Sequence, residues 1–182
     1  MPFESVDLEN LSDNPWKLIG KDWMLVTAGN LASWNTMTAS WGGLGVLWHQ
    51  NVAFVFVRPS RHTFEFMNRG DRFTLSFFPE ERREILTKCG SVSGRDADKA
   101  ALTGLDPFEP EPGVVSFRQA RLVLSCRKLY AQDLGPGHIV DPDVLKNYAN
   151  GDWHRMYVAK VEGAWVDGER KCTAEHLNHT TV

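Results

Sequence analysis

Val52-Ala53-Phe54-Val55-Phe56-Val57 is a run of six apolar residues that ends at Arg58-Pro59. β-Branched and aromatic side chains favour the pleated, partly buried surface of a sheet. Proline has no amide proton to donate to a neighbouring strand, so it marks the end of the run. The run is the strongest strand prediction in the chain, and the fold class follows from the segments on both sides of it.

Shorter apolar or alternating runs predict further strands. They lie at residues 22–27, 35–41, 72–78 and 155–166, with one or two more inside 114–131.

Two main helices are predicted between the strands. The first begins with Ser60 as its N-cap residue and ends at Gly70. The second spans 79–88, with proline and glutamates near its start and Lys88 near its end, as the helix dipole favours. Residues 89–99 and 106–113 are too polar or too rich in glycine and proline for core elements, so we expect loops there. A small helix is expected at 144–148.

Short strands outnumber helices, which favours a mainly β fold, an antiparallel barrel with peripheral helices. No Gly-x-Gly-x-x-Gly loop stands at a strand-to-helix junction, so a doubly wound dinucleotide-binding fold has no support. The 182 residues show no repeat and no shift in composition, and they suit a single domain over 1–182.

The composition bears on partners and location. A net charge of −3 gives no overall positive field, so we expect neither nucleic acid nor an anionic membrane as partner. No run approaches the ~20 apolar residues that span a bilayer, and residues 1–14 lack a signal-peptide pattern. Three separated cysteines suit a reducing compartment, so we expect a cytoplasmic protein.

Cys172, His176 and His179 could ligate a metal if helical, but a fourth ligand is not evident and a frayed tail is favoured, so no metal is predicted.

Arg58-Pro59-Ser60-Arg61-His62-Thr63 gathers positive charge and hydroxyl groups at the start of the first predicted helix. Cations there are unfavourable by about 0.3 to 1 kcal/mol each, because a helix N-terminus is itself partly positive. A bound phosphate would reverse this cost, and backbone amides, guanidinium groups and hydroxyls are the donors that it needs. The alternative is a solvated helix start with surface arginines.

The predicted strand at 35–41 alternates hydroxyl and apolar side chains. Thr36, Thr38 and Ser40 would share one face, where they could bond the edge of a heterocycle while Trp41 packs beside its rings. The alternative, which this strand taken alone favours, is an edge strand whose hydroxyls face water.

Four segments in this order resemble the flavin reductase-like, flavoredoxin-type FMN-binding proteins: Asn35 to Gly42, Arg58 to Thr63, Cys89 to Lys99, and Asp152 to Val158. The likeness covers about residues 20–166. It implies an FMN-binding split β-barrel of Greek-key type, with short extensions at both ends, that forms a homodimer and holds FMN near the subunit interface.

The resemblance also implies site residues. Those along the flavin would be Asn35, Thr36, Met37, Thr38, Ala39, Ser40 and Trp41, and those around its phosphate Arg58, Ser60, Arg61 and Thr63. The residues of a second cofactor loop would be Cys89, Gly90, Ser93 and Lys99. His154 matches a family histidine near the flavin, although His138 could hold that position instead. Without the resemblance, His154 is by default a core histidine, Lys99 a solvated loop residue and Cys89 a packing residue.

The function implied is that of a flavin reductase. NAD(P)H, as co-substrate, would donate a hydride to FMN, and the electrons would pass to free flavin, a small oxidant or a redox partner protein. Such a transfer needs no general acid or base, so no catalytic residue is predicted. Two alternatives stay open: an electron carrier of flavoredoxin type that does not oxidise a nucleotide, and a non-redox barrel that binds another phosphate-bearing ligand.

Overall fold

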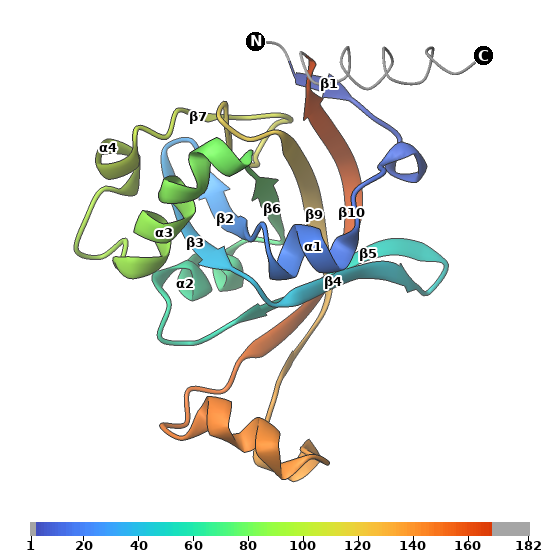
Figure 1. Ribbon diagram of the computed structural model, residues 1–182, viewed down its shortest axis with the longest axis vertical. Coiled ribbons are helices and arrows are strands. Elements are labelled where there is room, and N and C mark those ends of the chain that lie inside the picture. The colour runs from blue at the N-terminus through green and yellow to red at the C-terminus, as the bar shows by residue number, and fades with distance from the viewer. Residues whose placement is uncertain (1–2, 169–182) are drawn as a thin grey trace.

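The computed structural model describes residues 3–168. Most of its strands form one antiparallel sheet in the order β3-β2-β6-β9-β10-β5-β4, and β1 pairs with the far end of β10 (Figure 1). The predicted antiparallel architecture is confirmed. The strands are β1 (Phe3–Ser5), β2 (Met24–Asn30), β3 (Ser33–Ala39), β4 (Gly42–Leu47), β5 (Gln50–Val57), β6 (Arg72–Phe77), β9 (Leu122–Asp133) and β10 (Arg155–Asp167).

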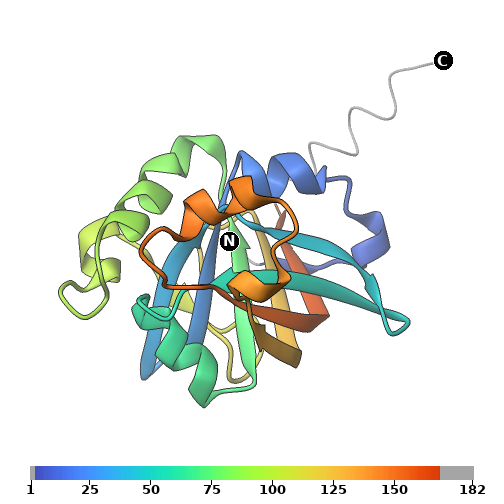
Figure 2. The same ribbon diagram turned by 90° about the horizontal axis from the view of Figure 1, so that it is seen from below.

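The sheet is strongly curved, as the view from below shows (Figure 2). Its two edge strands, β3 and β4, follow one another in the chain through Ser40 and Trp41 alone. Gly42 makes this passage possible, because a Cβ atom there would lie 2.7 Å from the carbonyl oxygen of Phe54. The concave side encloses the main apolar core, which includes Val26, Val55, Leu75, Leu124 and Tyr157.

The helices lie around this curved sheet (Figures 1 and 2). α3 packs over a second apolar cluster, in which Leu86 and Cys89 of the helix meet Leu25 and Val123 of the sheet. The helices are α1 (Pro15–Gly20), α2 (His62–Arg69), α3 (Arg83–Ser91) and α4 (Lys99–Thr103), with 3-10 turns η1 (Leu8–Asn10), η2 (Glu80–Arg82), η3 (Pro136–His138) and η4 (Pro142–Tyr148) and a short ribbon of β7 (Pro107–Phe108) and β8 (Ser116–Phe117).

Residues 134–154, here called the arm, connect β9 to β10 and carry η3 and η4. The arm extends beyond one end of the barrel (Figure 1, orange). It returns to the body of the protein at its last residues, where the guanidinium group of Arg58 donates to the carbonyl groups of Asn147 and Asp152. One wall of the candidate site described below is therefore built from the arm.

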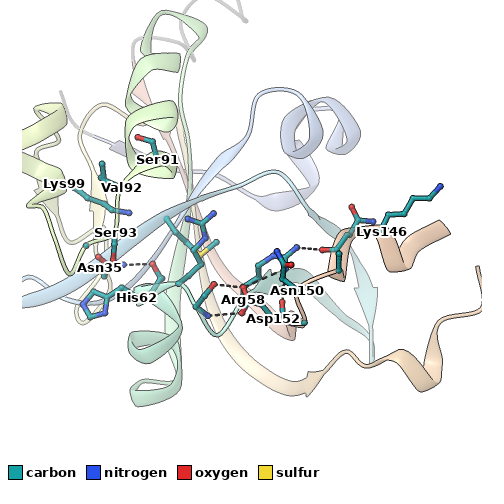
Figure 3. A pocket seen from close by; sticks show the side chains of 18 residues that line it. Asn35, Arg58, His62, Ser91, Val92, Ser93, Lys99, Lys146, Asn150 and Asp152 are labelled. Carbon is teal, nitrogen blue, oxygen red and sulfur yellow. Dashed lines mark hydrogen bonds and ion pairs between the residues drawn. The ribbon is translucent and has the colours of Figure 1, made fainter. Parts of the chain in front are cut away.

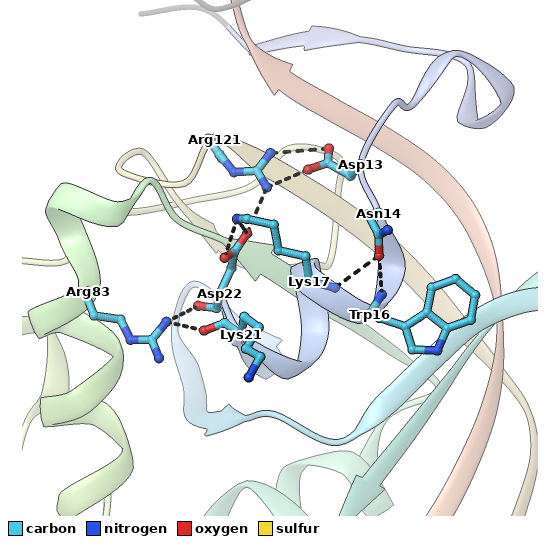
Figure 4. A network of polar contacts seen from close by, with 8 residues as sticks. All are labelled: Asp13, Asn14, Trp16, Lys17, Lys21, Asp22, Arg83 and Arg121. Carbon is cyan, nitrogen blue, oxygen red and sulfur yellow. Dashed lines mark hydrogen bonds and ion pairs between the residues drawn. The ribbon is translucent and has the colours of Figure 1, made fainter.

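A network of charged side chains fixes α1 (Figure 4). Arg121, immediately before β9, pairs with Asp13 at 2.7 Å and with Asp22 at 3.9 Å, and Lys17 of α1 pairs with Asp22 at 2.6 Å. Arg83 of α3 donates to the two backbone carbonyls that follow α1, at 2.5 and 3.0 Å. α1 is therefore tied to both the sheet and α3.

The predicted strands are found, with ends displaced by up to three residues, and the helix predicted from Ser60 ends next to Gly70 as expected. The N-cap assignment was wrong. The N-cap residue is Arg61, which makes no side-chain cap bond, while the hydroxyl of Ser60 donates to Asp152 instead.

Other differences have clear causes. The segment 89–99 is a loop only in its middle, because α3 continues to Ser91, with Cys89 packed in the apolar cluster, and α4 begins at Lys99. β4 and the elements before residue 22 were not predicted. β4 is rich in glycine, and its backbone bonds to β5 hold it in the sheet. Part of the predicted connection at 106–113 forms β7, which pairs with β8.

No helix among residues 3–168 is long and apolar enough to cross a membrane.

Candidate functional site

Two neighbouring cavities open beside β3, at the end of the barrel that carries the arm. The polar cavity, of about 490 Å³, lies between the start of α2, residues 91–99 and the arm (Figure 3). The aromatic cavity, of about 230 Å³, lies where β3 passes into β4. Met37, Arg58 and Arg61 line both cavities. The two cavities together are called the groove.

Asn35 organises one wall of the polar cavity. Its side-chain amide lies 2.6 Å from the hydroxyl of Thr63, and with the amide oxygen turned toward α2 it also accepts the Thr63 backbone N–H at 3.0 Å. β3 is thereby joined to the first turn of α2. Gly94 passes so close to this amide that a Cβ atom would lie 1.8 Å from an amide atom of Asn35. Glycine is required there for steric reasons.

Lys99 reaches the same wall from α4. Its side chain is buried, with the residue only 6% exposed, and its Nζ donates to the carbonyls of Thr36 at 2.8 Å and Cys89 at 2.7 Å. Burial lowers the pKa of Lys99. An ammonium group has three donors, so one remains for a ligand in the polar cavity. The default expectation of a solvated lysine was wrong.

Arg58 and Ser60 meet a carboxylate of the protein itself (Figure 3). Asp152 accepts the Ser60 backbone N–H at 3.1 Å and its hydroxyl at 2.6 Å, and its Oδ2 lies 3.9 Å from Arg58 Nη1. Arg58 also donates to the carbonyl of Asp152 and lies over the ring of Tyr148. The sequence placed both residues around a bound phosphate, and the structure gives both an internal partner.

Arg61 is different from Arg58, although only two residues separate them. Its guanidinium donates to the carbonyl of Gly90 at 3.3 Å and makes no ion pair within residues 3–168. Lys99 likewise has no carboxylate partner there, whereas Lys146 on the arm pairs with Asp143 at 2.6 Å. The positive charge that remains unneutralised in the groove is therefore concentrated on Arg61 and Lys99.

The aromatic cavity is dominated by two rings. Trp41 is 45% exposed, and its ring centroid lies 5.1 Å from that of His154. His154 is buried, and its Nδ1 lies 2.9 Å from the hydroxyl of Tyr148, which stacks on Trp153 with ring centroids 4.1 Å apart. Burial, with the positive charge of Arg58, lowers the pKa of His154 to about 4. The imidazole is therefore neutral at neutral pH and offers a single N–H donor.

The groove brings together most of the residues that the resemblance named. Those that line it are Asn35, Met37, Thr38, Ala39, Ser40, Trp41, Arg58, Ser60, Arg61, Thr63, Ser93, Lys99 and His154. Thr36, Cys89 and Gly90 line neither cavity and support residues that do. His138 is exposed in η3 and also lines neither.

Two hydroxyls of the predicted row bond within the protein, although Thr38 and Ser40 also line the aromatic cavity. Thr36 bonds the hydroxyl of its cross-strand neighbour Thr27 at 2.8 Å, and Thr38 donates to the carbonyl of Leu86 in α3. These two hydroxyls therefore have partners within the protein, one on β2 and one on α3. The thiol of Cys89 is buried as well, and burial raises its pKa, which suits the packing role.

Gly94, Tyr148 and Asp152 received no role from the sequence, and neither did the other arm residues that line the polar cavity. Gly94 and Asp152 lie within the segments that resemble the family. The sequence of a segment does not show which hydrogen-bond donors the Asp152 carboxylate will contact in the fold. Within residues 3–168 no group of three or more potential metal ligands is found. Cys172, His176 and His179 lie outside the described residues.

Comparison with solved structures defines the class of fold. A flavin reductase-like enzyme from Shewanella baltica, described as an FMN-binding domain, has a TM-score of 0.66 at 20% identity over 92% of this chain and 78% of that one. Flavoredoxin from Desulfovibrio vulgaris gives 0.63 at 17% identity, over 90% and 77%. An NADH:FAD oxidoreductase from Streptomyces globisporus gives 0.61 at 14% identity, over 81% and 76%. The fold is a split β-barrel, as predicted.

The family follows from the sequence of the whole chain. The model of the flavin reductase like domain matches residues 17–180. The protein therefore belongs to the flavin reductase-like family. No curated protein matches the chain.

Proposed function

We propose that this protein binds FMN in the groove, with the phosphate in the polar cavity and the ring system in the aromatic cavity. The observation that carries the proposal is the pairing of two unlike cavities through shared residues: one end is cationic and polar, and the other is lined by Trp41, Phe56 and His154. FMN has the same polarity, with an anionic ester at one end and a flat heterocycle at the other. The polar cavity, of about 490 Å³, lies within the range of cofactor pockets, about 300–1,000 Å³, and the smaller aromatic cavity of about 230 Å³ adjoins it.

The residues present fit the phosphate end. Arg61 and Lys99 supply two positive charges without carboxylate partners in the described chain, which match a phosphate dianion. Ser93 adds a hydroxyl from the loop wall of the polar cavity, next to Gly94. The close approach at Gly94 keeps this wall near Asn35, so the donors are held in place by the fold before a ligand arrives.

The residues also fit the ring end. Trp41 and His154 give flat surfaces, and Met37 and Ala39 of β3 give apolar contact. The neutral imidazole of His154, held at Nδ1 by Tyr148, adds no charge beside the ring. When bound, FMN supplies the ability to accept and release a hydride, and the protein's task is to bind, orient and partly enclose it.

We further propose that NAD(P)H is the co-substrate and that the protein is an oxidoreductase that passes electrons to free flavin, a small oxidant or a redox partner. Membership of the flavin reductase-like family supports this, as does the shared fold with an NADH:FAD oxidoreductase. A homodimer is part of the proposal. An apolar cavity between α1 and β4, lined by Trp16, Trp41 and Leu44, adjoins the groove and suits a second subunit.

Two measurements test the proposal in sequence. The purified protein is first titrated with FMN, and binding is followed by quenching of flavin fluorescence. The complex is then mixed anaerobically with NADH or NADPH, and loss of the visible band of oxidised flavin is recorded. Binding with bleaching supports a reductase. Binding without bleaching by either nucleotide overturns the reductase and leaves an electron carrier of flavoredoxin type, while absence of binding overturns the FMN site in favour of another phosphate-bearing ligand.

A further inference from the structure

Asp152 sits among donors that would otherwise bind an anion. Its two carboxylate oxygens take the Ser60 backbone N–H at 3.1 Å and the Ser60 hydroxyl at 2.6 Å, and Arg58 Nη1 lies 3.9 Å from the carboxylate. These donors are called the Arg58–Ser60 subsite. In chemical terms it is an anion site that the protein fills with its own carboxylate.

The carboxylate is held firmly. Arg58 donates at 2.9 Å to the backbone carbonyls of both Asp152 and Asn147, and its guanidinium lies 5.2 Å from the centre of the Tyr148 ring. Asp152 also has a φ of +52°, which is uncommon for a residue with a side chain, and it follows Gly151 at +73°. The arm therefore has a left-handed backbone conformation at the two residues that place the carboxylate in the subsite.

The subsite lies next to the unneutralised charge in the same polar cavity. A single phosphate can bind Arg61 and Lys99 without disturbing Asp152. A second phosphate that continued toward Arg58 would meet the Asp152 carboxylate. It would find the Ser60 donors and Arg58 already bound to that carboxylate. Contact between like charges costs several kcal/mol, and proteins use such repulsion to reject unwanted ligands.

We propose that Asp152 is a specificity-determining residue that closes the Arg58–Ser60 subsite and so limits the groove to ligands with a single phosphate group. For the flavins this selects FMN over FAD, whose diphosphate would extend toward the subsite. The inference rests on the proposed function where it names flavins. The general form, one phosphate against two, rests on the contacts of Asp152 alone.

The test is Asp152→Asn. The amide keeps the size and can still accept from Ser60, and asparagine tolerates a positive φ better than most residues. The affinities of riboflavin, FMN and FAD are measured by fluorescence quenching for the wild type and the variant. Asp141→Asn is the matched control, because it removes the same charge from the same arm at an exposed position outside the groove, where asparagine can keep the cap bond from the Asp143 backbone N–H.

We expect Asp152→Asn to bind FAD about tenfold more tightly than the wild type does, with FMN changed by less than about threefold and riboflavin unchanged. Asp141→Asn should match the wild type for all three. An unchanged ratio of FAD to FMN affinity would overturn the proposal. Equal weakening of all three flavins would also overturn it, because it would show that Asp152 only holds the arm.

A second readout separates this inference from the proposed function. If the wild type binds no flavin, the proposed function fails, and calorimetric titration with inorganic phosphate and pyrophosphate then decides the inference. Pyrophosphate should bind Asp152→Asn about tenfold more tightly than the wild type, and an equal affinity would refute the role of Asp152. Should the asparagine variant not fold, Asp152→Gly serves instead, because glycine accepts the positive φ.

Discussion

Arg61→Gln should weaken FMN binding and leave riboflavin binding unchanged. Arg61 is one of two cations in the groove without a carboxylate partner in the described chain, and the bond from its guanidinium to the carbonyl of Gly90 is long at 3.3 Å. Hydrogen bonds to charged groups contribute about 1.5–3 kcal/mol. Because Arg61 is exposed, we expect the lower end of this range, which corresponds to about a tenfold loss of affinity.

The assay is a titration of the protein with FMN and with riboflavin, followed by fluorescence quenching at low and high salt. Riboflavin lacks the phosphate, so it reports on the ring end alone. Arg69→Gln is the matched control, since Arg69 lies at the other end of α2, pairs with Glu65 and lines neither cavity. Arg58→Gln is a less clean test, because Arg58 also holds the arm through two backbone carbonyls.

The salt dependence adds a second check, because a contact with a phosphate at an exposed site is screened. The difference between wild type and Arg61→Gln should shrink as salt rises. If both proteins bind FMN equally at low salt, the phosphate does not lie beside Arg61. If riboflavin weakens as much as FMN, the substitution has altered the groove as a whole, and the assignment of its polar end is refuted.

Three further predictions concern the walls of the groove. Lys99→Met removes both bonds from the ammonium to the carbonyls of Thr36 and Cys89 and should lower the free energy of unfolding by about 1–3 kcal/mol in urea titrations; an unchanged midpoint would show that these bonds contribute nothing. Gly94→Ala should push residues 91–99 away from Asn35 and weaken FMN binding about tenfold or more, whereas Gly135→Ala, where a Cβ meets open space, should bind as the wild type does. The pKa of His154 is lowered from 6.5 to about 4. Between those pH values its imidazole is therefore protonated in the unfolded chain and neutral in the folded protein. The free energy of unfolding should therefore fall by about 3 kcal/mol more in the wild type than in His154→Gln as the pH drops through this window, and parallel pH profiles would refute the burial of a neutral imidazole.

The elements that could be predicted are those whose information is local. Residues 52–57 are apolar on both faces and end at proline, and β5 occupies nearly the same span. β4 has no such pattern, because Gly42, Gly43 and Gly45 leave few side chains to alternate. It is a strand because β5 supplies its hydrogen-bond partners, which no inspection of residues 42–47 can show.

Most of the residues that the sequence named for the site line the groove, but the arm residues that line it were not predicted, and the binding roles stay predictions. Short motifs identified most residues that line the groove, since each motif keeps its residues on one strand or one helix start. The motifs did not show that the Thr36 hydroxyl would bond Thr27 and that the Thr38 hydroxyl would donate to a carbonyl of α3. That depends on which face of β3 the helix covers.

What the sequence determined by itself is the mainly β architecture and the gathering of cations around residues 58–61, because strand formation and charge density depend on neighbours in the chain. The tertiary structure alone decided how those charges are divided. Asp152 is more than ninety positions from Arg58 and Ser60 along the chain, yet it pairs with Arg58 and accepts from Ser60, while Arg61 has no acidic partner in the described chain. Electrostatic interactions depend on distance in space, and only the folded path of the arm sets that distance.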